Sequence, residues 1–303
     1  MDRRHLLAGT VALVAAPLLA SVGRIRTSRA ASTREIPGTL RQLTTPGAGD
    51  NRVTFMPDGK RLLFVSNRSG KSQIWQMDPD GGHPKRFHAS TANDYGRIAP
   101  NSSGTAISFS SDRDGQNAVY VLELASAHIA RISDPAFWSF GPTWSAHDLI
   151  AFFSKKGGNK INTWTARPDG SQTRQITNQP GESRQPWWSP DGDTLALSAD
   201  HGTNSFTVWL MSPDGSSARS ITGRGSYEQP FWSPDGRRIA VSAKIDEPRQ
   251  RIYVMGTDGS DPEPIQQPEG VANVHPAWSP DGRSIVFTSG SGAGGSIYSF
   301  ELT

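Results

Sequence analysis

Cysteine is absent from the 303-residue chain. Its absence excludes a disulfide framework, a thiolate metal site, a cysteine nucleophile and an acylated lipoprotein cysteine. No stretch after residue 31 shows a convincing 3.6-residue hydrophobic period, so no amphipathic helix is expected there. The mean hydropathy of -0.50 excludes a polytopic membrane protein. The abundant residues are those of turns, with 31 Gly and 22 Pro.

Residues 1–31 read as an export signal. Arg3 and Arg4 precede an apolar stretch at 6–22, and Ser28-Arg29-Ala30 places small residues where a signal peptidase cleaves, so we expect cleavage after Ala30. The arginine pair resembles a twin-arginine signal, which implies export of the folded chain to the periplasm or another extracytoplasmic space. An uncleaved membrane anchor is the alternative, because about 18 apolar residues can span a bilayer.

The leader also carries the basic charge of the chain. Residues 1–31 hold five of the 31 basic and one of the 28 acidic residues, which leaves 26 basic against 27 acidic residues in the remainder. The isoelectric point near 9.3 therefore does not indicate a basic face for nucleic acid. We expect no nucleic-acid partner, and contact with a membrane only through an uncleaved leader.

The remainder of the chain is built from an internal repeat. A Trp-Ser-Pro-Asp-Gly string recurs at 188–192, 232–236 and 278–282, and divergent copies bring the total to six. The copies begin at Phe55, Ile98, Trp144, Trp188, Trp232 and Trp278. A second series of turns lies between them, at Asp80, Ala125, Asp169, Asp214 and Asp258. Because period-2 apolar runs lie between the turns, each unit is predicted to be a four-stranded antiparallel meander.

Four-stranded units with this spacing are typical of propeller blades. The short strand that closes most units also occurs ahead of the first unit, at Arg41–Thr45, whereas the last unit stops after Ser296–Phe300. We expect the segment 41–45 to complete the C-terminal blade, because that pairing removes two open sheet edges. The predicted fold class is all-β: a six-bladed β-propeller over residues 41–303, after a short linker at 32–40.

The string Trp-Ser-Pro-Asp-Gly-Arg-Arg-Ile-Ala-Val-Ser at 232–242 is followed by Ile-Tyr-Val-Met and Asp-Gly-Ser. This pattern is similar to the PD repeats, of WD type, in TolB-like β-propellers, and the resemblance covers residues 41–303. It implies periplasmic binding of an outer-membrane lipoprotein in a Tol-Pal system. TolB itself carries an α/β domain before its propeller, where this chain has only residues 32–40 between leader and first strand.

Several conspicuous motifs have structural explanations. Seven of the nine Trp recur at fixed repeat positions, which predicts packing between blades, while Trp138 and Trp187 are candidate stacking surfaces. The aspartates of the Pro-Asp-Gly turns and of 112–115 suit turn hydrogen bonds. The glycine-rich run 290–295 precedes a strand rather than the helix that a dinucleotide site needs. We expect no catalytic residue, metal or cofactor.

The segments that enter the first strand of each unit differ from one another. These strands line the central channel of a propeller, so the six segments should surround one mouth. A site for an asymmetric ligand must vary around the ring, although ordinary loop variation with polar groups meeting channel water is the alternative. The candidate ligand- or partner-binding residues are Arg52, Tyr95, Trp138, Arg184, Gln185, Glu228, Gln229 and His275.

The function predicted from these features is that of an exported, non-enzymatic scaffold that binds an envelope protein or lipoprotein. The alternative is a carbohydrate-active enzyme of the lyase type, or a propeller that binds a small ligand, because some PD-repeat propellers are polysaccharide lyases. Lyase chemistry needs a base and a positive group beside a carboxylate. His275 and Arg184 suit those roles only if they share one mouth. The sequence names neither the partner nor the oligomeric state.

Overall fold

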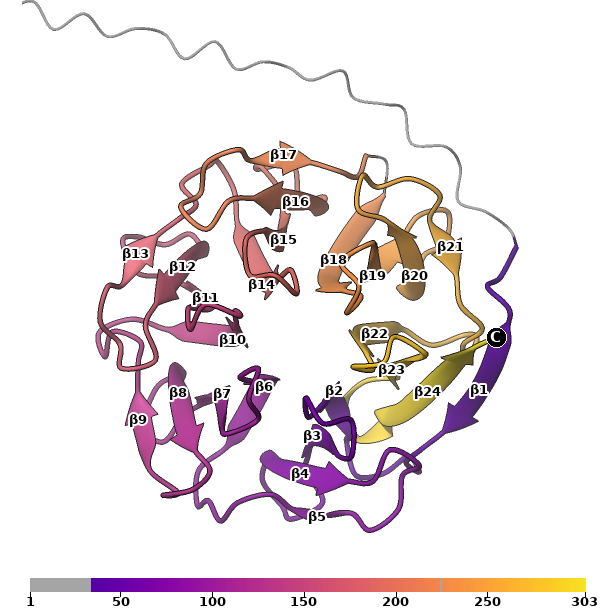
Figure 1. Cartoon of the computed structure of the whole chain (residues 1–303), viewed down its shortest axis with the longest axis horizontal. Coiled ribbons are helices and arrows are strands. Elements are labelled where there is room, and N and C mark those ends of the chain that lie inside the picture. The colour runs from indigo at the N-terminus through magenta and orange to yellow at the C-terminus, as the bar shows by residue number, and fades with distance from the viewer. Residues whose placement is uncertain (1–33, 224) are drawn as a thin grey trace, which may run out of the picture.

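Six antiparallel four-stranded sheets form a ring around a central channel (Figure 1). This is a computed structural model, and it describes residues 34–223 and 225–303. The predicted fold class, an all-β six-bladed propeller, is confirmed. The leader expected at 1–31 lies outside the described residues. Within the described ranges, no helix has the length and apolarity needed to cross a membrane.

Each blade runs from the channel outward. The innermost strands of blades 1 to 6 are β2 (Asn51–Phe55), β6 (Asp94–Pro100), β10 (Ser139–Trp144), β14 (Ser183–Trp188), β18 (Ser226–Trp232) and β22 (Asn273–Trp278). The second strands are β3 (Leu62–Ser66), β7 (Ala106–Ser111), β11 (Ile150–Ser154), β15 (Leu195–Ala199), β19 (Arg238–Lys244) and β23 (Ser284–Ser289).

The third and outer strands complete the blades. The third strands are β4 (Gln73–Met77), β8 (Ala118–Glu123), β12 (Asn162–Ala166), β16 (Thr207–Met211), β20 (Arg251–Gly256) and β24 (Ser296–Leu302). The outer strands are β5 (Lys85–Arg86), β9 (Ile129–Arg131), β13 (Arg174–Gln175), β17 (Arg219–Ser220), β21 (Glu263–Pro264) and β1 (Gly38–Gln42). A 3-10 helix, η1 (Gly292–Gly294), lies in the glycine-rich hairpin before β24.

The first strand of the described chain closes the ring. β1 pairs antiparallel with β24, from Gly38 opposite Leu302 to Gln42 opposite Tyr298 (Figure 1). The N–H of Leu43 donates to the carbonyl of Ile297 at 2.8 Å. Closure by an N-terminal strand is therefore confirmed, but the strand begins at Gly38, three residues before the expected Arg41. Part of the segment expected to be linker belongs to blade 6.

The hydrophobic core lies between neighbouring blades. The second strands are buried on both faces, and every residue of β3, β11 and β15 is buried. One cluster joins Leu63 of blade 1 to Ile107 of blade 2, and another joins Phe64 of blade 1 to Val286 of blade 6, with Leu43 packed against it. Burial of apolar surface between blades therefore stabilises the ring as a whole.

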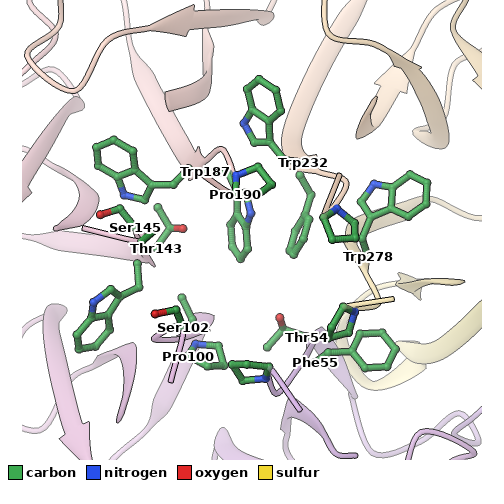
Figure 2. A pocket seen from close by; sticks show the side chains of 18 of the residues that line it. Thr54, Phe55, Pro100, Ser102, Thr143, Ser145, Trp187, Pro190, Trp232 and Trp278 are labelled. Atoms are coloured by element: carbon green, nitrogen blue, oxygen red, sulfur yellow. The ribbon is translucent and has the colours of Figure 1, made fainter. Parts of the chain in front are cut away.

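The Pro-Asp-Gly turns end the innermost strands as predicted. Gly192 has a φ of 80°, and its N–H donates to the Ser189 carbonyl at 2.9 Å. Asp191 Oδ1 accepts hydrogen bonds from Ser189 Oγ at 2.5 Å and from the Asp193 N–H at 3.0 Å, which lower the pKa of the carboxyl. These bonds explain the aspartate as a turn residue. Figure 2 shows Trp232, Trp278 and Pro190 around the mouth of the channel at this end.

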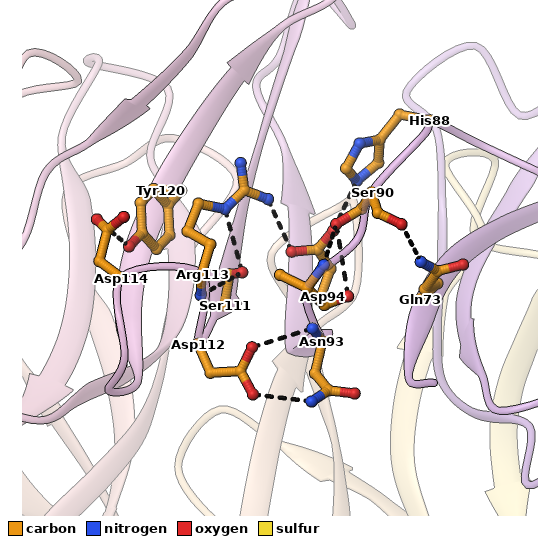
Figure 3. Close-up of polar contacts among 11 residues, drawn as sticks. Gln73, His88, Ser90, Asn93, Asp94, Ser111, Asp112, Arg113, Asp114 and Tyr120 are labelled. Carbon is orange, nitrogen blue, oxygen red and sulfur yellow. Dashed lines mark hydrogen bonds and ion pairs between the residues drawn. The ribbon is translucent and has the colours of Figure 1, made fainter. Parts of the chain in front are cut away.

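A buried ion pair fixes the start of β6 (Figure 3). The Asp94 side chain is fully buried, and its Oδ1 lies 2.7 Å from Arg113 Nη2 and its Oδ2 lies 3.2 Å from His88 Nε2. Arg113 also donates to Ser111 Oγ and covers the ring of Tyr120. Burial raises the pKa of Asp94, but hydrogen bonds from His88, Ser111, Ser90 and Arg113 outweigh it and lower the pKa to about 2.

The same arrangement occurs in blade 1. Arg68 Nη2 lies 2.6 Å from Asp50 Oδ2, donates to Ser66 Oγ and covers the rings of Phe64 and Trp75. Each pair holds the entry of an innermost strand against the turn after the second strand. The segment 112–115 therefore serves as a structural turn, in which the N–H of Gly115 donates to the Asp112 carbonyl.

Substitution of Gly38 by Val tests the ring closure. A Cβ at this position would lie 2.2 Å from Phe300 Cζ and 2.4 Å from the Glu301 carbonyl oxygen, so β1 must shift away from β24. We expect the free energy of unfolding to fall by about 1–3 kcal/mol, the usual cost of overpacking. Thr39→Val, on the exposed neighbour, should stay within about 0.5 kcal/mol of the parent in denaturant unfolding. Equal stability of the two variants would contradict the closure.

The Asp94 ion pair predicts a defined acid response. Its pKa is about 2 in the folded chain and 3.8 without the fold, so its stabilisation is complete above about pH 4 and is lost as the pH falls through 2. Asp94→Asn should lower the free energy of unfolding by about 2 kcal/mol at pH 7. The difference in stability between the parent and Asp94→Asn should shrink as the pH falls from 4 to 2. Denaturant unfolding across this range measures it, with the exposed Asp261→Asn as control. A stability difference between the two chains that does not change with pH would refute the lowered pKa of Asp94.

Candidate functional site

Every innermost strand contains a β-bulge near its start. At the bulge the backbone enters the left-handed region, with positive φ at Arg52, Gly96, Gly141, Gln185, Gln229 and His275. Four of these six are not glycine, and a side chain in this conformation costs on the order of 1 kcal/mol. We call the end of the channel that these six residues surround the bulge mouth, and the end surrounded by the Pro-Asp-Gly turns the turn mouth.

Hydrogen bonds from the preceding blade hold the bulges in place. The N–H of Gly141 donates to Ser110 Oγ at 3.0 Å, and the N–H of Gln229 donates to Ser198 Oγ at 3.2 Å. The N–H of Arg52 in blade 1 donates to Thr288 Oγ1 of blade 6 at 3.0 Å. A hydroxyl on one blade therefore stabilises the strained residue on the next blade, and the last such contact crosses the ring closure.

A glutamine side chain replaces the hydroxyl at the bulge of blade 6. Gln229 Oε1 accepts hydrogen bonds from Ser242 Oγ and from the N–H of His275, both at 2.7 Å. Gln185 Oε1 in turn accepts from the N–H of Gln229 at 3.1 Å. Gln185 and Gln229 thus link blades 4, 5 and 6 as well as facing the channel.

A cavity of about 210 Å³ opens at the bulge mouth. Its lining residues are Arg52, Arg97, Trp138, Phe140, Gly141, Phe153, Ile161, Arg184, Gln185, Gln229 and His275. Six of the eight residues predicted from the sequence are among them: Arg52, Trp138, Arg184, Gln185, Gln229 and His275. These residues come from five of the six blades, so the cavity wall differs around the ring.

The other two predicted residues, Tyr95 and Glu228, do not line the cavity but contact residues that do. The Tyr95 hydroxyl is hydrogen-bonded to Asn117, and the Tyr95 ring lies 5.7 Å from that of Phe140. Glu228 Oε2 lies 3.6 Å from Arg184 Nη2, and its Oε1 accepts a hydrogen bond from Gln250 at 3.1 Å. Arg184 is therefore partly neutralised.

Arg97 is the important residue that the sequence analysis did not find. The β6 bulge skips from Tyr95 to Ala99, one residue more than in the other five innermost strands, and Arg97 lies within it. The N–H of Asn101 donates to the Ala106 carbonyl, as the N–H of Ser189 donates to the Thr194 carbonyl, so Asn101 is the equivalent of Ser189. Pro100 therefore precedes the position that the prolines of the other turns follow. Aligning Pro100 with those prolines conceals the insertion. The replacement of Pro-Asp-Gly by Asn-Ser-Ser-Gly at 101–104 was the available signal.

The charged groups of the bulge mouth influence one another. Burial lowers the pKa of Arg52 to about 10, and burial together with the charge of Arg52 lowers the pKa of Arg97 to about 9. Burial, with the two arginines, lowers the pKa of His275 well below its usual value. At pH 7 both guanidinium groups are charged and the imidazole is neutral, so the site has a positive potential.

Aromatic rings form one wall of the same cavity. Trp138 stacks on Phe140, with ring centroids 5.6 Å apart and planes at 4°, and both contact Phe153. The Arg52 guanidinium lies 5.4 Å from the centre of the Phe140 ring. Trp138, predicted as a stacking surface, uses one face for this internal contact.

The turn mouth is a second site that the sequence analysis missed. A cavity of about 280 Å³ there is lined by Trp144, Trp187, Trp188, Trp232, Trp278 and Phe55, among others (Figure 2). Trp188, Trp232 and Trp278 are also buried in the clusters between blades, as predicted. Trp187 stacks on Phe231, with centroids 3.9 Å apart. A narrow space of about 20 Å³ shares Arg52, Arg97 and His275 with the cavity at the bulge mouth. It shares Trp187 and Phe231 with the cavity at the turn mouth.

Among residues 34–223 and 225–303, no cluster of three or more His, Asp or Glu side chains suits a metal ion. The predicted binding residues instead supply cations, amides and aromatic faces. This set is suited to recognition of an anionic or aromatic group.

Comparison with known proteins identifies the type of propeller. No protein-family model matches the chain. Residues of this chain are 29% identical over 139 positions to the protein TolB homolog of Chlorobium luteolum, covering 46% of this chain and 31% of that protein. They are 45% identical over 49 positions to the Tol-Pal system protein TolB of Nitratidesulfovibrio vulgaris, covering 16% and 11%. The matches thus span about a third or less of the length of these relatives.

Solved structures agree in fold. The crystal structure of TolB from Acinetobacter baumannii superposes with a TM-score of 0.67 at 18% identity, covering 80% of this chain and 66% of that one. An oligogalacturonate lyase in complex with manganese superposes with a TM-score of 0.58 at 16% identity, covering 90% and 98%. At such identities the likeness concerns the fold. Together with the sequence matches and the ring of six sheets, it shows that the chain is a TolB-like β-propeller.

Proposed function

We infer that the chain is an exported, non-enzymatic scaffold of the cell envelope, which binds a protein or lipoprotein partner at the bulge mouth. The similarity to TolB homologues, one of them named a Tol-Pal system protein, supports an envelope role. The leader expected at 1–31 supports export to the periplasm or another extracytoplasmic space. The propeller of residues 41–303, extended to Gly38 by β1, would be the part that binds.

The observation that carries this proposal is the asymmetry of the bulge mouth. Equivalent bulge positions hold Arg52, Gln185, Gln229 and His275 in four blades and glycine in two. The four side chains keep a strained backbone conformation although glycine would remove the strain. Gln185 and Gln229 have a structural role as links between blades, whereas the side chains of Arg52 and His275 form no hydrogen bond to another blade among the described residues. At Arg52 and His275 the costly backbone conformation is therefore better explained by recognition of an asymmetric partner than by structure.

The polar groups at the mouth are better suited to binding than to proton abstraction. Glu228 is engaged by Arg184 and Gln250. His275 has a pKa well below its usual value, which makes the imidazole a weak base. Lyase chemistry remains the second candidate because Arg184 and His275, the residues expected to share it, do line one cavity.

Photocrosslinking from the bulge mouth tests the scaffold proposal. Trp138→p-benzoylphenylalanine places a reactive ketone at the partly buried cavity wall, and Lys85→p-benzoylphenylalanine places it on the exposed outer strand β5. With intact envelope fractions, we expect a discrete protein adduct from position 138 at least about tenfold stronger than from position 85, because contact residues cluster at a binding site. Adducts of equal yield from both positions would count against the bulge mouth.

An assay for the unsaturated product of oligogalacturonate cleavage tests the lyase activity. Incubation of the full chain with oligogalacturonate and Mn²⁺ should give no unsaturated product, whose conjugated double bond absorbs in the ultraviolet, because the candidate base is weakened by burial. An oligogalacturonate lyase serves as positive control. Product that forms with the parent chain and disappears with His275→Ala would reverse the ranking of the two functions.

A further inference from the structure

Two arginines in the channel have no counter-charge within the described part of the chain. Arg97 Nη1 donates to the carbonyl of Pro186 at 2.9 Å, and its guanidinium lies 4.6 Å from the centre of the Trp187 ring. Arg52 contacts the ring of Phe140. Among the described residues, neither guanidinium forms an ion pair with a carboxylate. Their mutual repulsion contributes to the lowered pKa of Arg97.

Three of the other four arginines that pack over aromatic rings are each paired with a carboxylate. Arg68 is paired with Asp50, Arg113 with Asp94, and Arg184 with Glu228. The fourth, Arg238, lies over the Trp278 ring and has no carboxylate partner among the described residues. The channel pair differs from Arg238 because two unpaired guanidinium groups line one cavity. Arg52 and Arg97 are partly buried in the wall of the cavity, and a charge that has lost part of its hydration is costly without a partner. Such charges are typical of functional sites, where a ligand can supply the partner.

The surroundings of the pair define what would complete it. His275 lines both channel spaces beside the two arginines, and its buried Nδ1 has no hydrogen-bond partner within the described part of the chain. The wall next to these polar groups is formed by Trp138, Phe140 and Phe153. A complementary ligand has a negative end for the guanidinium groups and an apolar or planar body for the rings.

We propose that Arg52 and Arg97 bind an organic carboxylate in the channel, with its apolar body against the Trp138 and Phe140 rings. A planar carboxylate matches the donor geometry of guanidinium, and the neutral imidazole of His275 adds a hydrogen bond. Inorganic phosphate shares the negative charge but leaves the aromatic wall uncovered. This inference deepens the proposed function. It rests on that function in one respect, namely that the carboxylate belongs to an acidic side chain or the chain end of the envelope partner.

Calorimetric titration with benzoate tests the site itself. At pH 7 and low ionic strength the full chain should bind benzoate in a saturable manner, at least about tenfold more tightly than inorganic phosphate, and should not bind the neutral analogue benzamide. Arg52→Met and Arg97→Met should each weaken benzoate binding at least about tenfold. Arg219→Met, an exposed site on β17, removes the same charge and should leave binding unchanged. Absence of benzoate binding, or equal binding by Arg97→Met, would overturn the proposal.

Thermal unfolding without ligand separates binding from structure. If the guanidinium of Arg52 serves to bind a ligand, Arg52→Met should have an unfolding midpoint equal to or above that of the parent chain, because the substitution removes an unpaired charge. The same melt with saturating benzoate should raise the parent's midpoint and leave that of Arg52→Met unmoved. A midpoint of ligand-free Arg52→Met several degrees below the parent's would assign the arginine a structural role and refute the inference.

Competition distinguishes this inference from the proposed function. The Trp138→p-benzoylphenylalanine chain lacks the Trp138 ring of the proposed site, so calorimetry on this chain first gives the benzoate concentration that saturates it. At that concentration, benzoate should suppress the crosslink from position 138 if the partner's carboxylate occupies the arginine pair. Benzoate binding with an undiminished crosslink would uphold the site and refute a partner's carboxylate as its occupant. Benzoate binding without any specific crosslink would uphold a small-molecule carboxylate site and refute the scaffold.

Discussion

The hydrogen bond from the N–H of Arg52 to Thr288 Oγ1 couples the closure of the ring to the geometry of the site. It joins the innermost strand of blade 1 to the second strand of blade 6, across the junction that β1 completes by pairing with β24. The left-handed backbone at Arg52 is held by a residue that is distant in sequence and adjacent only in the closed ring. Closure therefore does more than remove sheet edges, because it fixes the orientation of a channel side chain.

Strain and unmatched charge accumulate at the same end of the channel. The bulges hold four non-glycine residues in the left-handed region, and two of the arginines there have no carboxylate partner among the described residues. Neither feature contributes to stability, and both are maintained by the apolar clusters between blades and by buried pairs such as that of Asp94 with Arg113. A ring stabilised by its repeats can sustain unfavourable residues at a few positions, and these positions are where recognition is expected.

The features of the fold that follow from the internal repeat could be predicted from the sequence. Blade number, turn positions and closure follow from recurring strings, and six of the eight predicted mouth residues line the cavity. The misses have a common cause, which is that they depend on register. Arg97 lies in a bulge one residue longer than its counterparts, and the closing strand begins at Gly38 because its pairing extends to Leu302. Period alone does not reveal a local insertion or the extent of a ladder.

The two mouths differ in a way that bears on where partners are recognised. The turn mouth is lined largely by repeated tryptophans, of which Trp188, Trp232 and Trp278 are explained by their burial between blades. Trp187 lies outside the repeat and stacks on Phe231. The bulge mouth is lined by residues that no repeat requires, and Arg97 even needs an extra residue to be there. A uniform aromatic rim discriminates poorly between ligands, whereas cations placed on particular blades select charge and orientation. Specificity is thus expected from the end of the channel at which the repeat is broken.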